Sequence, residues 1–241
     1  MKQLKIVLIG YGKMGRIIEH IAQERGHQVV LRIDRGEEAL FDDPRFASAD
    51  VAIEFTSPQA AYANCLKTLE RGLPLVSGST GWSERLPEVR ELCEREGKTF
   101  FWSSNFSIGV YLFRQLVAQA SRLMRLAPDY QLSMSETHHV HKLDAPSGTA
   151  ITLAETVLAE RPELERWTLG TAAEGELPVV AYREGEVPGT HSLSFTSGVD
   201  RIELTHEAFG REGFAHGAVL AAEYAATHRG WLTMEDLVQS R

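Results

Sequence analysis

Short apolar runs alternate with helical patterns along the first hundred residues. Residues 4–10 form a continuous apolar run that ends in glycine, as in a buried parallel strand. The other strand-like runs cover residues 28–34, 50–56, 74–77 and 98–106. The stretches between them carry apolar residues at helical spacing and cover residues 13–26, 57–72 and 83–97. This alternation predicts crossover connections on a parallel, doubly wound sheet.

The pattern changes after about residue 107. Residues 107–124 read as one long apolar helix, and residues 130–139 alternate like a strand with one packed face. A helix begins near Ser147, and strand-like runs separated by glycine turns follow it at 178–185, 190–198 and 200–209. We therefore expect a Rossmann dinucleotide-binding domain at 1–107 and an α+β substrate domain with a mixed sheet at 108–210. Helices at 211–241 would return to the first domain.

Composition narrows the class of partner. Lys and Arg number 25 against 33 Asp and Glu, which gives a net charge of −8. That balance disfavours nucleic acid or an anionic membrane surface as the main partner. The two cysteines, Cys65 and Cys93, have neither metal-ligand nor disulfide spacing. The apolar run at the N-terminus is too short for a signal peptide, and nothing approaches the ~18 apolar residues of a membrane span. We expect a soluble protein of the cytoplasm.

A glycine-rich loop follows the first strand directly. Gly10, Gly12 and Gly15 have the spacing G-x-G-x-x-G and open a helix, as a dinucleotide fingerprint requires. Gly10 would allow the tight turn, Gly12 the approach of a pyrophosphate, and Gly15 the close packing of helix on strand. Asp34 ends the second strand and suits the ribose hydroxyls of NAD, while Arg35 suits the 2′-phosphate of NADP. The alternative is an ordinary glycine turn beside a surface Asp–Arg pair.

The stretch ETHHVHKLDAPSGTA at residues 136–150 concentrates the candidate chemistry. As a metal site it is poorly built, because His138 and His139 would point to opposite faces of a strand. His139 and His141 could share a face, but no cysteine or carboxylate cluster completes a site. We therefore expect no metal. A solvated charged loop is a second interpretation, but it leaves the Pro-Ser-Gly-Thr sequence unexplained.

An anion site beside an acid explains the whole stretch. Pro146 stands near the first helical position, and Ser147, Gly148 and Thr149 follow, so free backbone N–H groups and hydroxyls gather at a helix N-terminus. Lys142 adds a positive charge, and histidine is the natural proton donor near neutral pH. The sequence thus predicts hydride reduction of a small anionic, carboxylated substrate, with the proton coming from a histidine.

At these residues the chain resembles the dihydrodipicolinate reductase family, whose signature E-x-H-H-x-x-K-x-D-A-P-S-G-T-A is complete from Glu136 to Ala150. The resemblance implies NAD(P)H-dependent reduction of 4-hydroxy-tetrahydrodipicolinate in lysine and diaminopimelate biosynthesis. It implies that His138 is the general acid and Lys142 its catalytic partner. The substrate carboxylates would then be held by His139, Ser147, Gly148 and Thr149. It also places His191 at the rim of the substrate domain.

The same resemblance extends over the glycine loop, the F-T segment, the G-S-T-G loop and the S-S-N-F segment. It implies a homotetramer, a hinge between the domains, and NADH or NADPH as cofactor. The cofactor would contact Gly10, Tyr11, Gly12, Lys13, Met14, Gly15, Asp34, Arg35, Phe55, Thr56, Gly78, Ser79, Thr80, Ser103, Ser104, Asn105 and Phe106.

Three departures from the family pattern concern the cofactor half. The glycine loop is one residue shorter than the commoner family form, the segment from Asp34 to Glu54 is trimmed, and Ser79 replaces a threonine. The rival hypotheses are a dehydrogenase of sugars or semialdehydes and a non-catalytic sensor of NAD(P). The first would need a lysine or cysteine near residues 78–81 or 103–107, where none stands. The second would have no use for His138, Lys142 and the Ser-Gly-Thr turn together.

Overall fold

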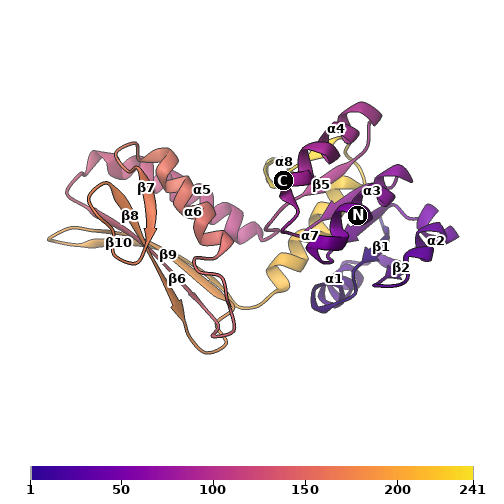
Figure 1. The fold of residues 1–241 in the computed structure, drawn as a ribbon, viewed down its shortest axis with the longest axis horizontal. Helices are drawn as coiled ribbons and strands as arrows, with labels where there is room; N and C mark the ends of the chain where they lie inside the picture. The colour runs from indigo at the N-terminus through magenta and orange to yellow at the C-terminus, as the bar shows by residue number, and fades with distance from the viewer. Residues whose placement is uncertain (1, 241) are drawn as a thin grey trace. The chain divides into compact units, whose positions relative to one another are not determined.

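The computed structural model describes residues 2–240 and divides the chain into two compact units (Figure 1). Unit 1 combines the residues up to Ile108 with those from Arg211 onward, and unit 2 consists of Gly109–Gly210. The chain therefore leaves the first unit once and returns to it once.

Unit 1 is built on a six-stranded sheet in the order β11-β5-β4-β3-β1-β2, in which every neighbouring pair is parallel. The strands are β1 Lys5–Ile9, β2 Gln28–Ile33, β3 Val51–Glu54, β4 Leu75–Ser77, β5 Phe100–Trp102 and β11 Trp231–Leu232. Every residue of β3 and β4 is buried, which explains why these strands are almost purely apolar. The strand order reverses beside β1, and ligands of such sheets bind at the carboxyl ends of the strands at that point.

Helices connect these strands and cover the sheet. They are α1 Lys13–Glu24, α2 Pro44–Ala47, α3 Pro58–Glu70, α4 Leu86–Glu96, α7 Glu212–Ala225 and α8 Met234–Gln239. The alanine-rich α7 packs against α1 and over β3 and β4. Its half-buried Glu223 accepts a hydrogen bond from Arg25 Nε at 2.7 Å and pairs with His27 Nε2 at 2.8 Å. These contacts fix the C-terminal segment in unit 1.

Unit 2 is a five-stranded mixed sheet in the order β10-β9-β6-β8-β7. The strands are β6 Gln131–His138, β7 Arg166–Leu169, β8 Glu176–Arg183, β9 Gly189–Thr196 and β10 Arg201–Ala208. The central strand β6 is antiparallel to β9 and parallel to β8. The helices α5 Ile108–Leu123 and α6 Gly148–Glu160 contribute Phe113, Val117, Leu153 and Val157 to one core with Met134, Val179 and Phe195 of the sheet.

The predicted fold class is confirmed, while several details are not. The strands β7 and β11 and the short helix α2 were not predicted from the sequence. Pro146 does not begin the helix as expected, because Ser147 is the N-cap and α6 starts at Gly148. The Ser147 hydroxyl accepts the Ala150 N–H at 3.1 Å, which sets that start.

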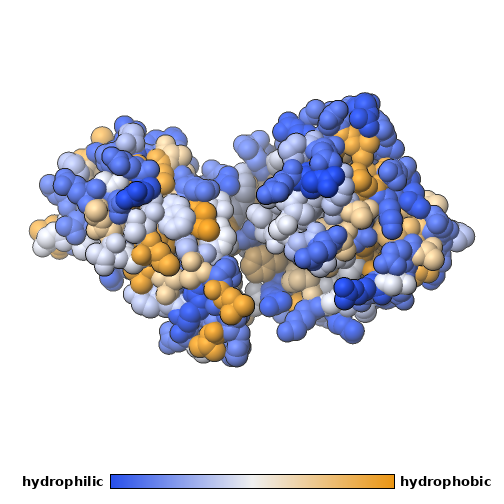
Figure 2. Space-filling model, in the orientation of Figure 1, coloured by the Kyte–Doolittle hydropathy of each residue, from blue (hydrophilic) through white to orange (hydrophobic). Residues whose placement is uncertain are grey.

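Hydrophilic side chains predominate on the face shown in Figure 2, with apolar groups in small patches. Among the described residues, none of the helices has the length and apolar character needed to span a bilayer.

Candidate active site

The glycine loop of unit 1 packs closely against the neighbouring backbone. A Cβ on Gly10 would lie 2.1 Å from the Phe55 carbonyl oxygen, and one on Gly15 would lie 2.3 Å from the Gly10 carbonyl oxygen. By contrast, nothing lies within 4 Å of a Cβ on Gly12, which is the N-cap of α1. The loop therefore packs through Gly10 and Gly15, and it leaves the backbone at Gly12 open at a helix N-terminus, where phosphate groups bind.

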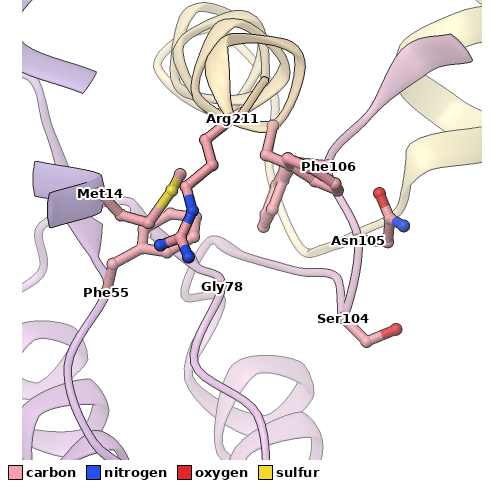
Figure 3. A pocket seen from close by; sticks show the side chains of 8 residues that line it. Met14, Phe55, Gly78, Ser104, Asn105, Phe106 and Arg211 are labelled. Carbon is pink, nitrogen blue, oxygen red and sulfur yellow. The ribbon is translucent and has the colours of Figure 1, made fainter. Parts of the chain in front are cut away.

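Two adjoining pockets lie at the carboxyl ends of the parallel strands of unit 1, with volumes of about 280 Å³ and 340 Å³. Met14, Phe55, Gly78 and Arg211 line both of them. Figure 3 shows the Arg211 side chain running from the start of α7 into the first pocket, beside Met14 and Phe55. Arg211 and Phe214 were not predicted. A basic residue at the start of the returning helix is the signal that could have indicated Arg211.

Most of the expected cofactor residues gather around these pockets. Their lining includes Gly12, Lys13, Met14, Phe55, Thr56, Gly78, Ser79, Thr80, Ser104, Asn105 and Phe106. The remaining six expected residues, Gly10, Tyr11, Gly15, Asp34, Arg35 and Ser103, do not line them. Ser103 instead orders its own turn, because its hydroxyl donates to the Asn105 carbonyl at 2.7 Å.

Tyr11 and the Asp34–Arg35 pair lie outside the pocket lining. Tyr11 donates to Glu19, and the guanidinium of Arg16 lies 4.9 Å from its ring centroid. Asp34 and Arg35 are exposed just beyond the end of β2, and the Arg35 N–H donates to Asp34 Oδ1 at 2.9 Å. The position of Asp34 is the one from which a carboxylate reaches the ribose of a dinucleotide.

A buried carboxylate binds the loops that line the second pocket. Glu54, which is fully buried at the end of β3, accepts from Ser77 Oγ at 2.6 Å, from Ser79 Oγ at 2.7 Å and from the Thr56 N–H at 2.9 Å. The sequence analysis assigned no role to Glu54. The Ser79 hydroxyl therefore bonds to Glu54, although Ser79 also lines one of the pockets.

In unit 2, four polar residues of three neighbouring strands meet on the packed face of the sheet. Register places Glu136 opposite His191 and His138 beside Arg183. Glu136 Oε2 lies 3.4 Å from His138 Nδ1 and 3.6 Å from His191 Nε2, and Glu136 Oε1 lies 3.4 Å from Arg183. The side chain of Glu136 is fully buried and that of His138 is nine per cent exposed. Neither Glu136 nor Arg183 was predicted as a site residue from the sequence.

The signature loop folds back onto this cluster. The Ser147 N–H donates to both oxygens of Glu136 at 3.1 Å, and the Ser147 hydroxyl lies 3.2 Å from His191 Nε2. A Cβ added to Gly148, in the first turn of α6, would meet open space. Thr149 follows it in that turn. Of the expected substrate residues, the structure thus brings Ser147 directly to the His138 cluster.

The other predicted residues of the loop have different neighbours. Lys142 donates to Asp144 at 2.8 and 2.9 Å, and the His139 and His141 rings lie 6.0 Å apart. His138 ends β6 and is buried, whereas His139 lies beyond the strand and is half-buried. The two neighbouring histidines therefore have separate surroundings, but because β6 ends at His138 the strand alternation expected from the sequence does not extend to His139.

Burial and charge act in opposite directions on these groups. Burial lowers the pKa of His138 to about 4; the Glu136 carboxylate opposes this change, while His191, Lys142 and Arg183 add to it. Burial also disfavours the charged form of Glu136. Hydrogen bonds from His191 and Ser147, together with the charge of His138, outweigh that effect and lower the pKa of Glu136 to about 2. Near neutral pH the cluster therefore holds an ionised carboxylate beside a neutral His138.

Comparison with known proteins agrees with both units. Sequence profiles described as "Dihydrodipicolinate reductase, N-terminus" and "Dihydrodipicolinate reductase, C-terminus" match residues 4–106 and 109–238. The chain belongs to the dihydrodipicolinate reductase family. A 4-hydroxy-tetrahydrodipicolinate reductase of Christiangramia forsetii is 43% identical over 98% of both chains. One of Archaeoglobus fulgidus is 36% identical over 95% of this chain and 96% of the relative.

Solved structures resemble the chain in fold. A dipicolinate-bound dihydrodipicolinate reductase from Paenisporosarcina sp. TG-14 has a TM-score of 0.77 at 20% identity, over 96% of this chain and 98% of that one. An amine dehydrogenase from Mycobacterium smegmatis has a TM-score of 0.61 at 13% identity, over 98% and 95%. Family membership makes the protein an oxidoreductase with a dinucleotide-binding domain.

One cluster also has the spacing of a cation site. One ligand atom each from Glu136, His138 and His191 lies within 4.8 Å of the others. This is a different set from the His138, His139 and His141 considered in the sequence. Both oxygens of Glu136 accept the Ser147 N–H, and the two imidazole nitrogens lie 3.4 and 3.6 Å from Oε2.

Proposed function

We propose that this protein reduces 4-hydroxy-tetrahydrodipicolinate to tetrahydrodipicolinate with NADH or NADPH, as a step of lysine and diaminopimelate biosynthesis in the cytoplasm. Family membership and the names of its relatives support this assignment. The observation that carries it within the chain is the buried His138 cluster joined to the Ser147 turn. It combines a proton-transfer group with an anion-binding helix start.

The balanced reaction consumes the hydroxylated substrate, NAD(P)H and one proton, and it yields tetrahydrodipicolinate, NAD(P)⁺ and water. Bound NADH or NADPH supplies the hydride. Gly12 to Met14 and the loops around Thr56, Gly78 and Asn105 would hold it, because they line the pockets of unit 1. Asp34 and Arg35 would contact the adenosine ribose and, in NADPH, its 2′-phosphate.

His138 is the proposed proton donor to the reduced ring, and Lys142 is its proposed partner. A buried imidazole that is neutral in the free protein must gain its proton as the substrate binds. The negative charges of a dicarboxylate favour that gain, since opposite charge nearby stabilises the protonated form. His139, the Ser147 hydroxyl and the first turn of α6 at Gly148 and Thr149 would hold the carboxylates. The dipicolinate-bound relative supports a ligand of this class.

We further propose that the protein is a homotetramer that assembles through unit 2. The face of β6 and β9 opposite the packed one carries four half-buried small polar residues, Ser133, Ser135, Ser192 and Ser194. Sedimentation of the wild type and of Ser194→Arg would test this proposal. A smaller assembly in the variant is expected, and a monomeric wild type would contradict it.

The deciding experiment is a coupled assay in which a dihydrodipicolinate synthase generates the substrate, with the oxidation of NADH and of NADPH followed separately. We expect turnover that requires the synthase product. Calorimetry with pyridine-2,6-dicarboxylate in the presence of NADH is the companion measurement. Cofactor binding without turnover and without dicarboxylate binding would favour a sensor of NAD(P) over a reductase.

A further inference from the structure

Two residues of opposite charge in unit 2, Glu136 and Arg183, lie next to His138, the proposed proton donor. Glu136 stands two residues before His138 on β6, and Arg183 lies beside His138 on β8. Glu136 and His138 point to the same, packed face, because residues two apart on a strand share a face. Arg183 lies beside His138 in the register of β8 and contacts Glu136. Glu136 is fully buried, and the side chain of Arg183 is 21% exposed.

Glu136 is connected to each part of the site. Its oxygens lie 3.4 Å from His138 Nδ1 and 3.6 Å from His191 Nε2, and both accept the Ser147 N–H at 3.1 Å. One buried carboxylate therefore links the proton donor, its neighbouring histidine and the turn that opens α6. A buried charge with these neighbours favours one arrangement of the site, since the Ser147 N–H would otherwise lose its partner and the carboxylate its nearby cations.

Arg183 holds the other side of the same loop. Its Nε donates to the Lys142 carbonyl at 3.2 Å, and an Nη donates to the Asp144 carbonyl at 2.5 Å. The same guanidinium lies 3.4 Å from Glu136 Oε1. The loop from His139 to Pro146 is thus attached to the sheet through its backbone, whatever side chains it presents to a ligand.

We infer that Glu136 and Arg183 are positioning residues, which hold His138 and the Ser147 turn together through one pair of opposite charges, the fully buried Glu136 and the half-buried Arg183. Because their charges are opposite, the two residues affect the proton of His138 in opposite directions. Glu136 favours the protonated imidazole, whereas Arg183 disfavours it, together with Lys142 of the loop and His191 of β9. The inference deepens the proposed function and rests on it for the role of His138.

The test is a pair of variants, Glu136→Gln and Arg183→Gln, in the full-length protein. The ¹⁵N imidazole signals of His138, assigned with His138→Gln, are followed by NMR as the pH changes. We expect the titration midpoint to fall by roughly one pH unit or more in Glu136→Gln and to rise by a smaller amount in Arg183→Gln. Glu184→Gln and Arg201→Gln are the matched controls, because both residues are exposed, and they should leave the midpoint at the wild-type value.

Glu136→Asp separates the two parts of the inference. It keeps the charge but shortens the reach to the Ser147 N–H. The titration of His138 should therefore stay closer to wild type than in Glu136→Gln, while dipicolinate binding weakens several-fold in both. Midpoints that stay at the wild-type value in both Gln variants, or that move in the same direction, would overturn the inference. The titration needs no turnover, so a wild type without reductase activity would refute the proposed function and leave this measurement interpretable.

Discussion

The hydroxyl of Ser79 donates to the buried carboxylate of Glu54 at 2.7 Å and accepts the Thr56 N–H at 2.8 Å. Ser79 and Thr56 belong to the loops that follow β4 and β3, and both line a pocket of unit 1. A family position where threonine is expected thus retains, as serine, the hydroxyl that makes these two bonds. The carboxylate joins the two loops beneath the proposed cofactor site.

Glu54→Gln should weaken cofactor binding through these loops. The variant loses the charge that strengthens the bonds from Ser77 and Ser79, so we expect a loss of about 1–3 kcal/mol in the free energy of unfolding. We also expect a KM for NADH raised several-fold, with kcat less affected. Steady-state kinetics with varied NADH and denaturant titration measure both. Glu70→Gln, an exposed change at the end of α3, is the control. An unchanged NADH KM would show that Glu54 does not shape the pocket.

Asp144→Asn should strengthen the binding of a dicarboxylate. In the structure the Lys142 ammonium is paired with Asp144 at 2.8 and 2.9 Å. Releasing it removes a competitor for an anionic ligand, and an exposed pair of this kind amounts to about 0.2–1 kcal/mol. The expected effect is a decrease of roughly 1.4-fold to fivefold in the Kd of dipicolinate, measured by calorimetry with NADH present. Lys142→Ala should raise that Kd, and equal changes in both variants would contradict the proposed role of Lys142.

Arg35→Ala should discriminate between the two cofactors. Arg35 is exposed beyond β2, where an arginine contacts the 2′-phosphate that only NADPH carries. We expect the KM for NADPH to rise by about tenfold, equivalent to about 1.4 kcal/mol, with little change for NADH. Asp34→Ser should show the opposite preference, because the carboxylate serves the ribose hydroxyls of NADH. The two cofactors act as each other's control, and an equal loss with both would assign Arg35 a structural role.

The sequence predicted the architecture because its signals are local. Strand 4–10, the glycine loop and the amphipathic helix after it are contiguous, and so is the stretch that joins His138 to Ser147. Glu136 is contiguous with His138, but the other two neighbours of His138 are not. Arg183 and His191 reach the site through the register of β8 and β9 against β6, and a single sequence does not determine that register. The two-residue strand β11 is too short for any periodicity to show.

The surroundings of the two buried glutamates, Glu54 and Glu136, likewise come from distant segments and could not be predicted from local sequence. Glu54 and Glu136 both stand in strand patterns, where a glutamate normally marks the solvent side. In the structure both are fully buried, because hydroxyl, amide and imidazole groups from other segments surround them. A carboxylate on the apolar face of a predicted strand is therefore a useful indication of a site, even though its partners cannot be named beforehand.

His138→Gln should abolish most of the proton-transfer advantage. General-acid groups typically contribute 10²–10⁴-fold to the rate, so we expect kcat to fall by about that factor at an unchanged Kd for NADH. His141→Gln is the matched control, because His141 is exposed and contacts Glu186 at 3.2 Å. Stopped-flow oxidation of NADH gives the rates, and cofactor fluorescence gives the Kd. Near-wild-type turnover in His138→Gln would remove His138 from the mechanism.

Binding of the dicarboxylate should take up a proton near pH 7. Burial lowers the pKa of His138 to about 4, which lies below its ordinary value of 6.5, so the free protein carries a neutral imidazole at pH 7. A dianionic ligand beside it stabilises the protonated form and raises the pKa, so protons move from the buffer to the protein. Calorimetry with dipicolinate and NADH in buffers of different ionisation enthalpy measures the number of protons taken up per bound ligand. Opposite charge raises a pKa by about 1–3 units, so from about 4 the pKa of His138 would reach about 7 at most, and we expect an uptake of up to about half a proton per site at pH 7. The uptake should vanish in His138→Gln and persist in His141→Gln. A wild type that binds dipicolinate without proton uptake would show that His138 is not charged by the ligand.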